Sequence, residues 1–149
     1  MIVVRVSLVV RYAGAPISLP GAHPLADNGL RDMKILLDNL PLSLQDQAET
    51  LRQCLLAFDQ VMPLQAVYLF GSHARGEARP DSDVDLCLVS ESAERPLAAA
   101  VEFRRAIRGI RPKPAFTLVP IMPARLREKR QKGDHFFHTV LQESIPLGA

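Results

Sequence analysis

The first regular hydrophobic pattern is a helical stripe between Ser43 and Pro63. Apolar residues follow one another there at spacings of four, three, four, three and four, which predicts one buried helix face. They are Leu44, Ala48, Leu51, Leu55, Phe58 and Met62. Ser43 has a side chain suited to an N-cap, with Asp46 in the first turn. Because proline ends helices, we expect the helix to stop before Pro63.

Three short apolar or alternating runs predict strands, at 66–70, 83–89 and 115–119. Two further stretches predict helices, at 94–109 and at 123–143, the second interrupted near Gly133. The order is therefore helix, strand, strand, helix, strand, helix. This order predicts a small α/β (α+β) fold, in which helices pack on a mixed sheet of three or more strands.

Residues 1–40 lack such a pattern and are interrupted by prolines and glycines. We expect an irregular N-terminal extension over 1–40 and the folded domain over 41–149. One hypothesis is that the natural chain starts at Met33. A signal peptide is the alternative, but the apolar core from Val6 to Val10 is shorter than the ~7–15 residues that such peptides need.

Composition narrows the class of protein. The chain has 149 residues, and its 48% hydrophobic content excludes a wholly disordered protein. No apolar run approaches the ~18 residues of a membrane span, so we expect no membrane partner. Two cysteines, Cys54 and Cys87, cannot build a disulfide framework and indicate a reducing, cytoplasmic location.

Charge is unevenly distributed. The net charge is +2, yet residues 104–132 carry ten basic side chains against Glu128 alone, which gives 10 − 1 = +9 and leaves 2 − 9 = −7 elsewhere. The basic residues are Arg104, Arg105, Arg108, Arg111, Lys113, Arg125, Arg127, Lys129, Arg130 and Lys132. Such a stretch can form a solvated surface, hold phosphates or an acidic partner, or bind RNA.

The candidate chemistry follows the 66–70 strand. Gly71 lets the backbone turn sharply and approach a ligand, and the Ser72 hydroxyl and the Arg75 cation lie next to it in sequence. Asp83 and Asp85 are two residues apart at the start of the next strand, so both carboxylates share one face. Mg²⁺ takes one or two protein carboxylates and leaves room for substrate phosphates. The pattern predicts a phosphate site beside a Mg²⁺ site.

Other metal-binding and nucleotide-binding motifs fit these residues less well. The EF-hand pattern beginning at Asp81 lacks its glycine and its final glutamate, and neither a P-loop nor a dinucleotide fingerprint is present. His135 and His138 have no further ligands to complete a zinc site. We expect His73 to face solvent and Cys87 to be a small core residue.

The segments 69–76 and 82–86 resemble the signature of the minimal nucleotidyltransferases, within the DNA polymerase beta superfamily. The resemblance implies that Gly71, Ser72, Arg75 and Ser82 bind the nucleotide. It implies that Asp83 and Asp85 are catalytic and bind one or two Mg²⁺ ions. The implied reaction moves a nucleoside monophosphate, AMP from ATP, to a hydroxyl acceptor.

Family members of this size are often antitoxins that modify a helical HEPN-type toxin. The resemblance therefore implies a HEPN-type toxin protein as partner, and self-association stays open. The family has a third carboxylate on the next strand, and the matching position here is Thr117. A neutral hydroxyl substitutes poorly for a metal ligand or a base. The alternative is a catalytically weakened module that neutralises a partner by binding.

Overall fold

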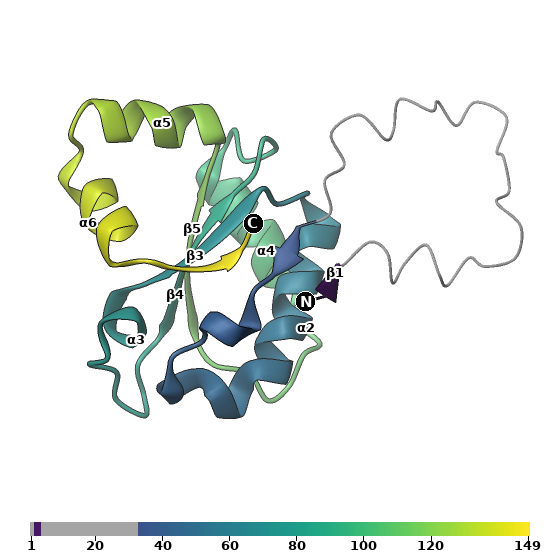
Figure 1. Ribbon diagram of the computed structural model, residues 1–149. Helices are drawn as coiled ribbons and strands as arrows, with labels where there is room; N and C mark the ends of the chain where they lie inside the picture. Colours follow the sequence, from purple (N-terminus) through teal and green to yellow (C-terminus); the bar gives the residue numbers. More distant parts are fainter. Residues whose placement is uncertain (1, 4–32) are drawn as a thin grey trace, which may run out of the picture.

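A six-stranded mixed sheet organises the chain in the computed structural model, which describes residues 2–3 and 33–149 (Figure 1). The strand order is β1-β2-β6-β3-β4-β5. The strands are β1 (Ile2–Val3), β2 (Lys34–Ile35), β3 (Ala66–Phe70), β4 (Val84–Val89), β5 (Phe116–Ile121) and β6 (Ile145–Gly148). Only the β4–β5 pair is parallel within this sheet; the other pairs are antiparallel.

Five α-helices and two 3₁₀ helices connect the described strands: η2 (Leu37–Asn39), η3 (Leu42–Gln47), α2 (Ala48–Val61), α3 (Gly71–Arg75), α4 (Pro96–Ala106), α5 (Pro123–Gln131) and α6 (His135–Glu143). Side chains alternate between the two faces of each strand, so each face has its own hydrophobic cluster. The mixed α/β fold predicted from the sequence is confirmed.

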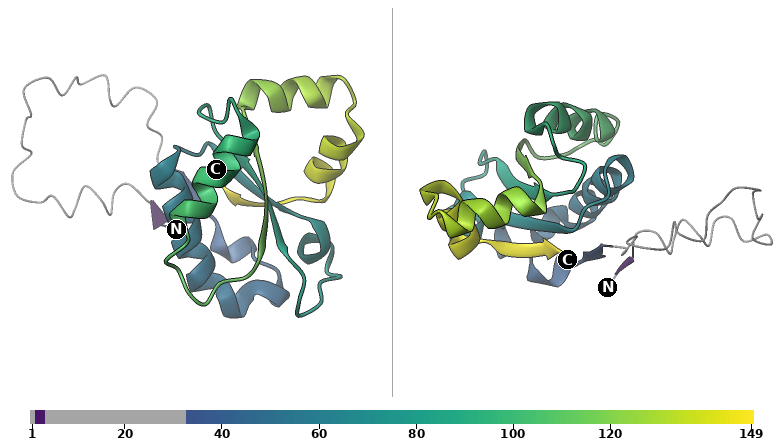
Figure 2. Two further views of the ribbon diagram at one scale, coloured as in Figure 1. Left: turned by 180° about the vertical axis from the view of Figure 1, so that it is seen from behind. Right: turned by 90° about the horizontal axis from the view of Figure 1, so that it is seen from above.

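The main core lies between one face of the sheet and helices α2 and α4. Leu86 and Leu88 of β4 point into it, together with Phe58 of α2 and Phe103 of α4. The Phe58 and Phe103 rings meet edge to face, with centroids 5.4 Å apart. In the rear view, α4 lies in front of the strands (Figure 2). The helices α2 and α4 therefore support β3 and β4 from this face of the sheet.

The opposite face of the sheet carries a smaller cluster. Cys87 and Val89 of β4 and Ile121 of β5 pack there against Leu126 of α5 and Val140 of α6. Cys87 is therefore a core residue, as predicted, and burial raises the pKa of its thiol to about 12. Asp83 and Asp85 continue this series towards the start of β4, at the same spacing of two residues. The face under α5 and α6 is therefore also the face that carries the carboxylates.

The segment 33–40 packs as part of the domain, whereas the sequence pattern predicts that it belongs to the extension. Met33, Ile35 and Leu40 are buried in the main core. The strand β2 pairs with β6 through Ile35 and Gly148. This segment is too short to show the hydrophobic repeat of a strand or helix, so its sequence alone does not reveal it as part of the domain. The expectations about residues 4–32 lie outside the described residues.

The predicted helices and strands recur with shifted ends. The predicted helix over 43–62 is α2 preceded by the 3₁₀ helix η3, and Ser43 is not its N-cap. The helix predicted over 123–143 divides into α5 and α6 at Gly133, whose φ is +68°. Strand β6 was not predicted. No described helix has the length and apolar character that a membrane crossing requires.

Candidate functional site

The turn from β3 into α3 is built around Gly71. Its φ is +75°, a left-handed conformation that costs a residue with a side chain roughly 1–2 kcal/mol. A Cβ at this position would also collide with the Asp85 carboxylate, lying 2.9 Å from its Cγ and closer still to Oδ2. Glycine is therefore required here twice, for the backbone angle and for the close approach of Asp85. The carboxylate and the turn form one compact unit.

Three residues stand side by side across the central strands at this end of the sheet. Asp85 pairs with Phe70 of β3 on one side and with Thr117 of β5 on the other. Directly paired residues have their side chains on the same face. The sheet register thus places Thr117 beside the carboxylates.

The hydroxyl of Thr117 lies beside both predicted metal ligands. It donates a hydrogen bond to Oδ2 of Asp83 over 3.3 Å, and hydrogen bonding from Thr117 also lowers the pKa of Asp85. In residues 2–3 and 33–149, no group of three or more His, Cys, Asp or Glu side chains gathers to hold a metal. The acidic set is therefore the pair Asp83 and Asp85, completed by a neutral hydroxyl.

Two opposing influences act on the Asp85 carboxyl. Burial is the larger one and raises its pKa above the ordinary value, and the nearby charge of Asp83 raises it further. The Thr117 hydrogen bond and the charges of His73 and Arg75 lower the pKa in part. A divalent cation bound between Asp83 and Asp85 would offset both the repulsion between the two carboxylates and the cost of burying the Asp85 charge. The chemistry of this donor pair fits Mg²⁺.

A cavity of about 360 Å³ opens directly over this unit. It is lined by Phe70, Gly71, Ser72, Arg75, Asp85, Phe136, Thr139, Val140 and Glu143. One wall is thus the β3–α3 turn with Asp85, and the other is α6. The structure brings together four of the residues singled out in the sequence, namely Gly71, Ser72, Arg75 and Asp85.

Sequence comparison identifies the family. The family model described as "Nucleotidyltransferase domain" matches residues 49–143, more than half of the chain. The chain belongs to the nucleotidyltransferase domain family. The matched region of this nucleotidyltransferase begins within α2 and ends with α6, so it includes both walls of the cavity.

A Sulfolobus solfataricus protein described as a proposed nucleotidyltransferase, solved at 1.40 Å, is similar with 18% identity and a TM-score of 0.48. The similarity covers 70% of this chain and 81% of that one. A search among curated proteins gave no match.

Arg75 of the nucleotidyltransferase joins α3 to α6. Its guanidinium forms ion pairs with Glu77 over 3.0 Å and with Glu143 over 3.2 Å. Both pairs are exposed, so each contributes little to stability. Arg75 lines the cavity, and the carboxylates of Glu77 and Glu143 offset its charge.

Ser82 lies on the other side of the turn. Its hydroxyl accepts a hydrogen bond from the Arg79 backbone N–H over 2.8 Å and shapes the loop that precedes Asp83. It lines a second cavity of about 540 Å³, together with His73 and Arg79. Its predicted nucleotide contact stays a prediction, and the structure does not bring Ser82 into the cavity over Asp85.

The prediction that His73 faces solvent is wrong. The side chain is buried, at 5% exposure. Nδ1 lies 2.8 Å from the Ser43 hydroxyl, and Nε2 lies 3.4 Å from the Ser82 carbonyl oxygen, which can only accept. Nε2 therefore donates to the Ser82 carbonyl oxygen, and Nδ1 is hydrogen-bonded with the Ser43 hydroxyl. His73 links η3 to the loop before Asp83, a long-range contact that no local sequence signal announces.

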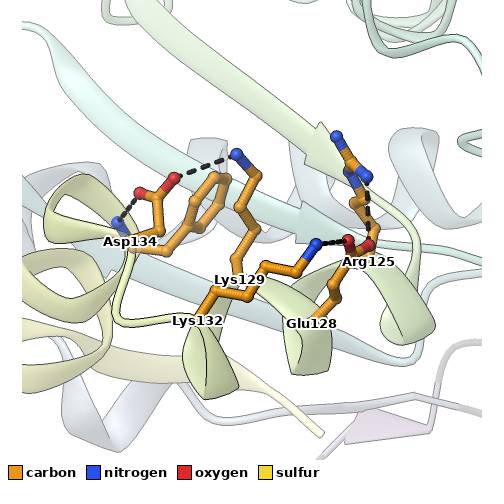
Figure 3. A network of polar contacts seen from close by, with 6 residues as sticks. Arg125, Glu128, Lys129, Lys132 and Asp134 are labelled. Carbon is orange, nitrogen blue, oxygen red and sulfur yellow. Dashed lines mark hydrogen bonds and ion pairs between the residues drawn. The ribbon is translucent and has the colours of Figure 1, made fainter.

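The basic stretch is partly neutralised on α5 (Figure 3). Arg125 and Lys132 both pair with Glu128, and Lys129 pairs with Asp134 over 2.9 Å. Asp134 in turn accepts from the Phe137 N–H and caps α6. These contacts join α5 to α6. Arg127 and Arg130 are exposed, and neither forms an ion pair with any residue in the described part of the chain.

Replacing Gly71 with alanine tests the turn. Gly71→Ala forces the Asp85 carboxylate away, whereas Gly76→Ala has nearly the same φ, +73°, with open space around its Cβ. Gly76→Ala should lose roughly 1–2 kcal/mol of stability from its backbone angle alone, and Gly71→Ala should lose more because of the added clash with Asp85. Only Gly71→Ala should also lose binding of Mg²⁺-ATP by calorimetry. Equal binding by both variants would contradict the assigned role of the Gly71–Asp85 contact.

Replacing Asp85 with asparagine tests the electrostatics in metal-free buffer with chelator. Since folding raises the Asp85 pKa, its contribution to stability is complete below the unfolded-chain pKa of about 3.9 and is lost as the pH rises through the folded value. Asp85→Asn should therefore raise the melting temperature at pH 7, with a gain that shrinks below pH 4. The exposed Asp81→Asn is the control. If Asp85→Asn melts at a lower temperature than the parent at pH 7, the ionised Asp85 does not destabilise the fold.

Proposed function

We propose that the protein is a Mg²⁺-dependent nucleotidyltransferase that moves AMP from ATP to a hydroxyl acceptor. The observation that carries the proposal is the close packing of the Asp85 carboxylate against Gly71, within a cavity that Ser72 also lines. Phosphates bound at the turn would lie next to a carboxylate pair suited to a divalent cation. Membership of the nucleotidyltransferase domain family agrees with this chemistry.

The reaction is a displacement at phosphorus. The acceptor oxygen forms a bond to the α-phosphorus, the bond from that phosphorus to the bridging oxygen breaks, and pyrophosphate leaves with the electron pair. Mg²⁺ held by Asp83 and Asp85 would supply Lewis-acid stabilisation of the phosphoryl oxygens. The turn at Gly71 and the Ser72 hydroxyl hold the phosphates in line. The acceptor's proton passes to a carboxylate or to water.

The acceptor is proposed from the motif. Residues 69–76 and 82–86 resemble minimal nucleotidyltransferases of the antitoxin type, so we propose a HEPN-type toxin as the protein that is adenylylated. Cys54 and Cys87 are both free and buried, which agrees with the cytoplasm as the location.

Transfer can be measured directly. The protein is incubated with ATP labelled on the α-phosphate, Mg²⁺ and a candidate toxin partner, and label on the partner is quantified. Asp83→Ala and Asp85→Ala should lower the rate at least about 100-fold, because a bound metal contributes several kcal/mol. Asp81→Ala, which lies outside the pair, should keep the parent rate. Equal transfer by all variants would disprove the proposal.

A second function is favoured by Thr117. Thr117, hydrogen-bonded to Asp83, is a neutral residue at the position where the family resemblance implies a third carboxylate, so the chain would neutralise its partner by binding alone. The discriminating outcome is neutralisation that survives Asp83→Ala and Asp85→Ala together. If the protein instead acts by nucleotidyl transfer, the double substitution of Asp83 and Asp85 abolishes neutralisation.

Restoring the carboxylate separates the two functions further. Thr117→Asp should raise Mg²⁺-dependent transfer at least about tenfold, because a base at the attacking hydroxyl contributes 10²–10⁴-fold when fully effective. Thr117→Asn is the matched control of similar shape without charge. If Thr117→Asp is no faster than Thr117→Asn, catalysis in this protein does not depend on a third carboxylate.

A further inference from the structure

One face of α6 forms the second wall of the cavity over Asp85. Phe136, Thr139, Val140 and Glu143 all line it. Their spacing of i, i+3, i+4 and i+7 places them on one side of a helix. This wall therefore offers one aromatic ring, one hydroxyl, one aliphatic group and one carboxylate to whatever enters the cavity.

Phe136 is unusual within this wall because it is 48% exposed. Its ring is held edge to face by Phe70, with centroids 6.0 Å apart, and by Phe137, with centroids 5.1 Å apart. Phe137 packs in the cluster under α5 and α6, whereas Phe136 does not belong to that cluster. An oriented aromatic ring is thus open to the cavity instead of filling the core.

The phosphate-binding turn lies next to this ring. Phe70, which contacts Phe136, is the residue before Gly71 and is paired with Asp85 across the sheet. The turn and Phe136 line the same cavity, so a nucleotide whose phosphates occupy the turn can place its base against this ring. Flat aromatic groups stack on such rings, and every nucleobase has a face suited to this.

We propose that Phe136 stacks on the base of the nucleoside triphosphate and provides the base-binding subsite of this protein. This inference rests on the proposed function and extends it from the phosphates to the base. Stacking is tolerant of base identity. Thr139 supplies a polar group that can both donate to and accept from the base edge.

Two probes separate the base from the phosphates. ATP and inorganic tripolyphosphate are titrated into the full chain by calorimetry, each with Mg²⁺. Removing a stacking ring costs about 1–3 kcal/mol per base, which corresponds to roughly 5–150-fold in Kd. Phe136→Ala should weaken ATP binding by this factor and leave tripolyphosphate binding unchanged. Phe136→Tyr, which keeps a ring, should restore ATP affinity.

Control variants exclude general damage. Leu97 is 86% exposed on α4, so Leu97→Ala removes an exposed apolar side chain away from the cavity and should change neither affinity. The inference is overturned if Phe136→Ala binds ATP as the parent does, or if it weakens both probes equally. If neither probe binds the parent protein, the proposed function itself fails, and the base subsite fails with it.

Discussion

The contact between the Asp85 carboxylate and the backbone of Gly71 is the constraint on which the site depends. It is possible because Gly71 has no side chain and because its left-handed turn brings the start of α3 beneath the carboxylate. Asp85 in turn sits between Phe70 and Thr117 in the sheet register. One contact therefore joins the turn, the carboxylate pair and the neighbouring strand.

The two faces of the sheet have different roles. Its rear face packs against α2 and α4 through a continuous apolar core, which holds β3 and β4 in register. Its front face carries the carboxylates at one end and the smaller cluster under α5 and α6 at the other. A partly buried carboxylate with a raised pKa is costly to the fold, and the rigid core behind it offsets that cost. Such costly groups are common at functional sites.

Local patterns predicted much of the molecule. The apolar runs gave β3, β4, β5 and most helices, and the motif located Gly71, Ser72, Asp83 and Asp85. What local patterns missed depends on distant contacts: the ring nitrogens of the buried His73 are satisfied by Ser43 and by the Ser82 carbonyl oxygen. Likewise, β2 and β6 are too short to show a period, and each exists through pairing. Phe136 appeared as part of a helix, and only the packing of α6 beside β3 brings its ring to the cavity.

The central claim is that Asp83 and Asp85 hold a divalent cation beside the nucleotide phosphates. The most direct measurement is Mn²⁺ binding by electron paramagnetic resonance, with a non-hydrolysable ATP analogue and the parent, Asp85→Asn and Asp81→Asn proteins. We predict that the parent and Asp81→Asn bind Mn²⁺ with the analogue and that Asp85→Asn loses this binding. Equal binding of Mn²⁺ by all three proteins would contradict the claim.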